Sequence, residues 1–159
     1  MLKYTDSQIT FSEIPDEITL CINISNCPFR CKGCHSKELW EDVGKELTPN
    51  EIDSLLQDGV SCLLFMGGDS DLPSLTELLK HVKICYPNVK TAWYSGRREV
   101  PLYDFPLILL DYIKLGPYIK EKGPLNNPNT NQRLYKLKHL DLYTLFKNIT
   151  ARLWKKNSI

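Results

Sequence analysis

Three cysteines in one short segment constrain this chain more than any other feature. Cys27, Cys31 and Cys34 follow the spacing C-x3-C-x2-C, with no fourth cysteine nearby in the sequence. Iron–sulfur clusters are normally held by cysteine thiolates. Four protein ligands would close the shell of such a centre, whereas three leave one coordination position open. The spacing therefore predicts an iron–sulfur cluster that keeps one position free for a substrate.

Two other interpretations of the cysteines remain open at this stage. The three could lie together by chance in a structural loop, or they could bind a structural zinc ion. Structural zinc takes four ligands, usually as two separated pairs. The nearest fourth candidate is His35, which directly follows Cys34 and is badly placed to complete a tetrahedron.

Composition limits the class of protein. The chain has 159 residues, 42% of them apolar, and a net charge of +1. We therefore expect one globular domain over residues 1–159, and neither nucleic acid nor a membrane as a partner. The first residues do not form a signal peptide, so we expect a cytoplasmic location. In that compartment disulfides are rare, and we interpret the three remaining cysteines as small buried apolar residues: Cys21, Cys62 and Cys85.

The order of the apolar segments predicts an α/β fold with a mostly parallel sheet. Apolar, β-branched runs predict strands within residues 18–24, 61–66, 89–95, 107–115 and 134–140, and a hairpin before the first of them. One helix should begin at Thr48 as N-cap and end at Gly59, and a second should begin at Pro73. We also expect a helix over residues 142–154. The polar segment 121–133 is long for a structureless loop, which is typical of a functional one.

A second motif, Met66-Gly67-Gly68-Asp69, follows one βα unit after the cysteines. Glycines let the backbone approach a ligand closely, and a carbonyl or carboxylate at a strand end can accept a hydrogen bond from an ammonium group. Together, the two motifs resemble the radical S-adenosylmethionine (SAM) superfamily. That resemblance implies a partial (βα) barrel and a [4Fe-4S] cluster on Cys27, Cys31 and Cys34, with SAM chelating the fourth iron.

The same resemblance suggests which residues contact SAM. Gly67, Gly68 and Asp69 would hold its amino group, and Gly33, Cys34 and His35 would line it. Ser95 and Lys114 are further candidates, for the ribose or the carboxylate of SAM. Each has a simpler alternative: His35 as a capping residue, Ser95 as a turn residue and Lys114 as a solvated lysine.

Several later segments resemble one family within the superfamily, the activating proteins of anaerobic ribonucleoside-triphosphate reductases. The resemblance is carried by residues 23–28, 33–35, 67–69, 111–118 and 128–133. It implies a glycyl-radical activase, which cleaves SAM reductively and abstracts a hydrogen from a glycine of the partner reductase. A flavodoxin-type protein would donate the electron. The alternatives are a radical SAM enzyme with another glycyl-radical partner or a small-molecule substrate, and a zinc-binding interaction module without catalysis.

Overall fold

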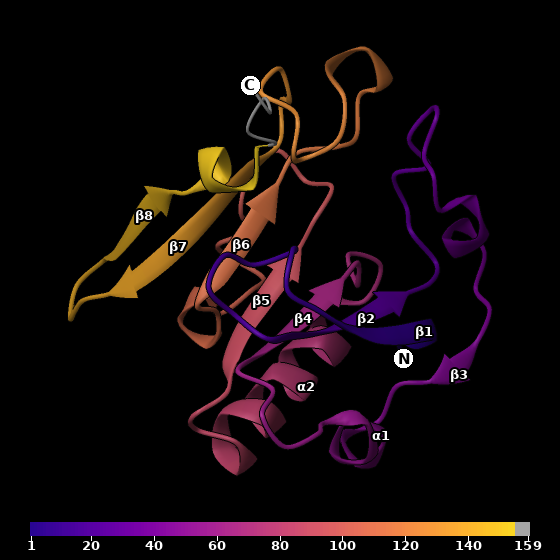
Figure 1. The fold of residues 1–159 in the computed structure, drawn as a ribbon. Helices are drawn as coiled ribbons and strands as arrows, with labels where there is room; N and C mark the ends of the chain where they lie inside the picture. Colours follow the sequence, from indigo (N-terminus) through magenta and orange to yellow (C-terminus); the bar gives the residue numbers. More distant parts are fainter. Residues whose placement is uncertain (155–159) are drawn as a thin grey trace.

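A single mixed sheet organises the fold. The computed structural model describes residues 1–154, in which eight strands form one sheet in the order β3-β1-β2-β4-β5-β6-β7-β8 (Figure 1). The strands are β1 (Lys3–Thr10), β2 (Thr19–Ile24), β3 (Lys45–Glu46), β4 (Cys62–Met66), β5 (Lys90–Tyr94), β6 (Tyr112–Leu115), β7 (Arg133–His139) and β8 (Thr144–Asn148). The α-helices of this part of the chain are α1 (Pro49–Leu55) and α2 (Leu72–Cys85), and short 3-10 turns cover Lys37–Trp40, Leu107–Leu109, Lys120–Lys122 and Thr150–Leu153.

The centre of the sheet is parallel and its two sides are antiparallel. Strands β2, β4, β5 and β6 pair in parallel, with Ile22 opposite Phe65 and Phe65 opposite Trp93. On one side β1 pairs antiparallel with β2 and β3, and on the other β7 pairs antiparallel with β6 and β8. The carboxyl ends of the four central strands therefore meet at one edge of the sheet, which is where ligands bind in open α/β sheets.

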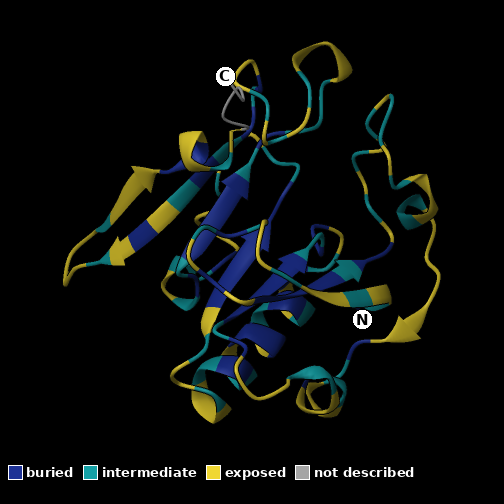
Figure 2. Ribbon diagram, viewed as in Figure 1, coloured by how far each residue is buried: buried dark blue, intermediate teal, exposed yellow. Residues whose placement is uncertain are grey.

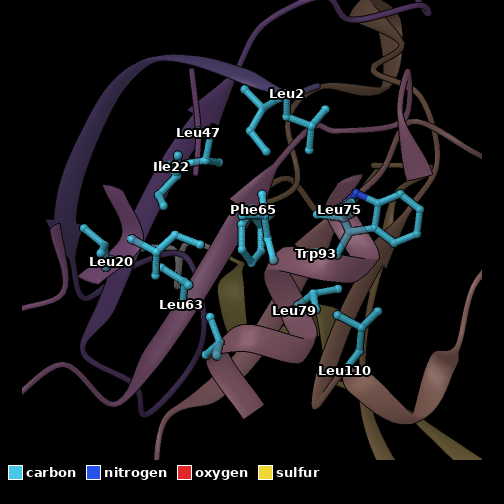
Figure 3. Close-up of a cluster of buried hydrophobic side chains, with 14 of the residues drawn as sticks. Leu2, Leu20, Ile22, Leu47, Leu63, Phe65, Leu75, Leu79, Trp93 and Leu110 are labelled. Atoms are coloured by element: carbon cyan, nitrogen blue, oxygen red, sulfur yellow. The ribbon is translucent and has the colours of Figure 1, made fainter. Parts of the chain in front are cut away.

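Alternate residues of the central strands enter two separate cores, because successive side chains point to opposite faces of a sheet. On one face Phe65 and Trp93 pack with Leu75 and Leu79 of α2 (Figure 3). On the other face Leu64 packs with a cluster that is closed by segment 11–18 and by the residues after β8. The central strands are buried on both sides, whereas much of β8 is exposed (Figure 2).

Several predicted elements are confirmed. The helix after Thr48 is α1, which ends at Leu55 and not at Gly59 as predicted. The Thr48 side chain accepts a hydrogen bond from the Glu51 backbone N–H at 3.2 Å. The predicted hairpin before β2 is β1–β2, and the predicted strand at 134–140 is β7.

The predicted helix over residues 142–154 is wrong. Strand β8 lies there instead, with Phe146 opposite Leu137 of β7, and a 3-10 turn follows. Ile149 and Thr150 are buried after this strand, and the Thr150 hydroxyl accepts a hydrogen bond from the Leu134 N–H at 2.8 Å. Pairing with β7 and this burial outweigh a weak local preference for helix. In the described part of the chain, no helix has both the length and the apolar character needed to span a membrane.

Candidate iron–sulfur site

A cavity of about 310 Å³ lies at the carboxyl edge of the central strands. It brings together the loop after β2, the ends of β4, β5 and β6, and the segments around residues 118, 125 and 132. Its wall includes all three cysteines of the predicted cluster motif: Cys27, Cys31 and Cys34. Segments far apart in the sequence therefore meet where the topology places a ligand site.

The cysteine loop folds back on the segment that follows it. The Cys27 N–H donates to the Leu39 carbonyl at 2.9 Å, and the Cys34 N–H donates to the Cys31 carbonyl at 3.0 Å. All six cysteines of the chain are free thiols, and the three in this loop are partly exposed. Burial raises the pKa of the Cys27 thiol, while backbone hydrogen bonds from Phe29 and Arg30 offset part of that rise.

The ring of Phe29 fixes the middle of this loop against the end of β5. A Cβ atom built on Gly96 would lie 2.5 Å from Cδ2 of Phe29, far inside van der Waals contact. Gly96 is therefore a point of close approach between the ring and the backbone. Only glycine, which has no Cβ atom, leaves room at position 96 for the Phe29 ring of the cysteine loop.

The Gly-Gly-Asp segment turns the chain sharply after β4. Gly67 and Gly68 have φ values of +103° and +101°, a backbone conformation that residues with a side chain rarely adopt. The Gly67 N–H donates to the Tyr94 carbonyl at 3.0 Å, and the Gly67 carbonyl accepts from the Trp93 indole at 3.0 Å. The turn is thus held by β5, and both backbone groups of Gly67 are paired.

Asp69 is a buried carboxylate with partners inside the protein. Its side chain is 2% exposed, and its Oδ1 accepts from the Ser95 hydroxyl at 2.5 Å and from Nε of Arg97 at 3.1 Å. Burial nevertheless raises the pKa of Asp69, because desolvation outweighs the hydrogen bond and the arginine charge. The guanidinium of Arg97 thus supplies the positive charge that pairs with this buried acid.

Of the predicted site residues, seven line the cavity and three do not. The cavity wall contains Cys27, Cys31, Cys34, His35, Gly67, Asp69 and Lys114. Gly33 faces the side chain of Lys120, and Gly68 faces the core residues Ile24, Leu2 and Leu75. Ser95 is fully buried, and its hydroxyl is used by Asp69. Gly68 and Ser95 therefore support the turn from the core side, whereas Gly33 packs on Lys120 outside the cavity.

The family comparison covers this whole arrangement. Residues 18–133 match the family described as a 4Fe-4S single cluster domain. The chain belongs to this family. No curated protein and no solved structure matches the chain. The matched region includes β2, the cysteine loop, the Gly-Gly-Asp turn and Lys114, so every predicted site residue lies inside it.

The donor set at the cavity fits the cofactor of this family. Three free thiols face one cavity, and thiolates are the ligands that iron–sulfur clusters require. Cys27, Cys31 and Cys34 are therefore the residues that would hold the cluster. Among residues 1–154, no three His, Cys, Asp or Glu side chains lie close enough together to bind a single metal ion.

Lys114 is buried, so the alternative of a solvated lysine is wrong. Its ammonium donates to Oε1 of Gln132 at 3.0 Å and to the Gly116 carbonyl at 3.1 Å, and it lies 5.7 Å from the centre of the Tyr94 ring. Burial lowers the pKa of Lys114 to about 8, although Asp69, Cys31 and Cys27 favour its charged form. The cavity of this protein therefore has an ammonium group on the same wall as the three thiols.

Sequence reasoning missed several residues of the wall, among them two polar side chains and a tyrosine. Gln132 holds Lys114, Tyr118 lies with its ring centre 5.6 Å from that of His35, and Glu13 reaches the cavity from the segment before β2. Gln132 belongs to the long polar segment 121–133, whose length was a usable signal. Nothing in the local sequence around Glu13 distinguishes it from a surface residue.

The other cysteines divide into two groups. Cys21 and Cys62 are fully buried as predicted, and burial raises the pKa of Cys21 to about 12. Cys85 is exposed, so its interpretation as a buried apolar residue is wrong. It is the last residue of α2, and its side chain lies beyond the apolar face of that helix.

Proposed function

We propose that this member of the 4Fe-4S single cluster family is a glycyl-radical activase of the radical SAM type. One observation carries the proposal: the three cysteines, Gly67, Asp69 and Lys114 line the same cavity at the carboxyl edge of the sheet. A partial barrel, a cytoplasmic location, the anaerobic ribonucleoside-triphosphate reductase as protein substrate and a flavodoxin-type electron donor belong to the same proposal. When bound, the cluster supplies the electron that cleaves SAM.

The residues of the wall suggest how SAM is oriented. Lys114 is a buried cation opposite the thiols, which suits the carboxylate of the methionine moiety. Asp69 has Oδ1 committed to Ser95 and Arg97, so it contributes a fixed negative charge near the ammonium group of SAM. A direct hydrogen bond from the ammonium group of SAM to Asp69 would therefore be accepted by the other carboxylate oxygen, Oδ2. His35 and Tyr118 form the side of the cavity next to Cys34.

The shape of the wall is also compatible with a protein substrate. The cavity is bounded on one side by the loop segment around Leu125 and on the other by the cysteine loop. Both are connections between strands and can differ in length without disturbing the sheet. A glycine-containing loop of a partner could reach the ligand between them.

Anaerobic reconstitution tests the proposal. The protein should bind about four irons and four sulfides per chain, and with dithionite it should convert SAM to 5′-deoxyadenosine. Cys27→Ala, Cys31→Ala and Cys34→Ala should each abolish this conversion. Cys85→Ser is the matched control and should retain it, because Cys85 lies at the other end of α2.

Electron paramagnetic resonance then tests the substrate. Mixing the reduced, SAM-loaded protein with the reductase should produce a glycyl-radical doublet on the reductase. Iron binding without 5′-deoxyadenosine would refute the radical SAM activity, and SAM cleavage without a doublet would refute the choice of substrate. Stoichiometric zinc in anaerobically purified protein, without a brown chromophore, would refute both.

A further inference from the structure

A second group of reactive side chains lies at the far end of α2 from the cavity. Helix α2 begins at Leu72, shortly after the Gly-Gly-Asp turn, and ends at Cys85, before β5 starts at the opposite edge of the sheet (Figure 1). Cys85 and His81 are four residues apart, so both lie on one side of the last turn. Asp53 of α1 faces them from the neighbouring helix.

The three side chains form a chain of hydrogen bonds. Sγ of Cys85 lies 3.6 Å from Nδ1 of His81, and Nε2 of His81 lies 2.6 Å from Oδ1 of Asp53. The Tyr86 hydroxyl also donates to Oδ1 of Asp53, at 2.8 Å. Hydrogen bonds from His81 and Tyr86 lower the pKa of Asp53, so its carboxylate is ionised at neutral pH.

This geometry fixes the tautomer of His81. An ionised carboxylate can only accept, so Nε2 carries the hydrogen that points to Asp53. In neutral His81 the lone pair of Nδ1 then faces the thiol of Cys85. A nucleophile, a base and a group that orients the base are the parts of an activated thiol.

The helix terminus makes His81 the decisive member of this group. The negative end of the helix dipole stabilises the imidazolium that His81 becomes when it takes the proton of Cys85, and it opposes a negative charge on Cys85 itself. Reactivity of Cys85 therefore depends on the adjacent imidazolium, which distinguishes this cysteine from an ordinary surface thiol.

Accessibility also separates Cys85 from the other cysteines. Cys21 and Cys62 are fully buried, and Cys27, Cys31 and Cys34 are the cluster ligands of the proposed function. Cys85 is exposed and lies at the opposite edge of the sheet. In the cluster-loaded protein it is therefore the thiol that a dissolved reagent can reach.

We propose that Cys85, His81 and Asp53 form a site of thiol–disulfide exchange with low-molecular-weight disulfides. The Cys85 thiol gives its proton to Nδ1 of His81, and Sγ attacks one sulfur of the reagent R–S–S–R. The reagent's S–S bond breaks as the new Sγ–S bond forms. The departing thiolate takes the proton from His81 and leaves as R–SH. Cys85 is oxidised to a mixed disulfide, and the second half of the reagent is reduced to a thiol.

Residue-resolved kinetics test this proposal. Cluster-loaded protein is treated with oxidised glutathione under anaerobic conditions, and the mixed disulfide at each cysteine is quantified by mass spectrometry of peptides. At pH 7 the wild-type rate at Cys85 should exceed that of His81→Gln by about a hundredfold, the lower end of what a positioned base contributes. The rate at Cys85 in Asp53→Asn should lie between those of the wild type and His81→Gln, since His81 then loses its fixed orientation.

A matched variant and a peptide separate reactivity from folding. Tyr86→Phe removes the other hydrogen bond to Asp53 but leaves the Cys85–His81 contact, so it should react at the wild-type rate.

The wild-type rate should also rise less steeply with pH than that of His81→Gln, because the proton of Cys85 already has an acceptor. Equal rates for wild type and His81→Gln would overturn the proposal. So would a wild-type rate no higher than that of an unfolded peptide containing Cys85, a comparison that stands even if a variant fails to fold.

Discussion

At the scale of single residues, Gly96 and Phe29 make a close contact that can be tested directly. The backbone of Gly96 permits other residues, since its φ is not positive, so only space forbids a side chain there. We predict that Gly96→Ala destabilises the apoprotein by about 1–3 kcal/mol, the usual cost of overpacking. It should also lower the iron content after reconstitution, because the Phe29 ring must move and the cysteine loop moves with it.

A double variant isolates this contact. Phe29→Ala removes the ring that the new methyl group would meet, so Gly96→Ala should cost much less in that background. Urea unfolding of the wild type, the two single variants and the double variant gives the coupling free energy between positions 29 and 96. If the two changes simply add, the contact does not hold the loop, and the explanation fails.

The residues of the site differ in how far the sequence revealed them. The spacing of Cys27, Cys31 and Cys34 is local, and it predicted that they act together. The bond from Ser95 to Asp69 joins residues 26 positions apart and arises only when β4 and β5 pair. The exposure of Cys85 was missed because its neighbours in the sequence are apolar, although the helix turns its side chain outward.

At the scale of elements, Glu17 ties three central strands together at the edge opposite the cavity. Burial alone would raise its pKa, but hydrogen bonds from Lys90, Ser61 and Tyr112 outweigh burial and lower it. An acid with a lowered pKa stabilises the fold above its unfolded pKa, and that contribution disappears as the pH falls through the folded pKa. We predict that Glu17→Gln loses about 2–3 kcal/mol at pH 7, and that the loss shrinks steadily below pH 4.5.

Glu13 provides the matched control for this prediction. Burial raises the pKa of Glu13, so its charged form destabilises the fold as the pH rises. The stability difference between wild type and Glu13→Gln should therefore change with pH in the opposite direction. Urea unfolding from pH 7 to pH 3 measures both. A difference for Glu17→Gln that stays constant over this range would contradict the ionic interpretation.

The elements also show where sequence patterns were sufficient. Helix α1 was predictable because its N-cap, Thr48, and its first-turn proline act within four residues. Strand β8 was not, since its pairing with β7 and the burial of Ile149 depend on the rest of the sheet. The parallel centre followed from continuous apolar runs, whereas antiparallel pairing at the sides depends on chain reversals that such runs do not specify.

At the scale of the whole molecule, the sheet and the cysteine loop should differ in their dependence on the cluster. The central strands bury an apolar core on each face of the sheet, and neither core contains any of the three cysteines of the loop. In the loop, in contrast, a few hydrogen bonds join one arm to the other: from the N–H of Asn26 to the Glu41 carbonyl at 3.0 Å, from Cys27 to Leu39, and from the Ser25 hydroxyl to the Val43 carbonyl at 2.6 Å. Phe29 contacts Gly96 beyond the loop. A cluster bound by three thiols of the loop would therefore add a strong restraint to it.

Removal of the cluster should consequently loosen the loop without unfolding the sheet. We predict that chelation of the iron lowers the thermal midpoint, because a cofactor that binds only the folded state stabilises it. Hydrogen exchange should accelerate by about tenfold or more in peptides covering residues 26–44, since the loop then opens locally, and should change little in peptides covering β4 and β5. Cys34→Ala, which lacks one ligand, should exchange like the chelated protein with or without chelator. Uniform acceleration of exchange over the sheet would mean that the cluster supports the core. Unchanged exchange in the loop would mean that Cys27, Cys31 and Cys34 do not bind the cluster.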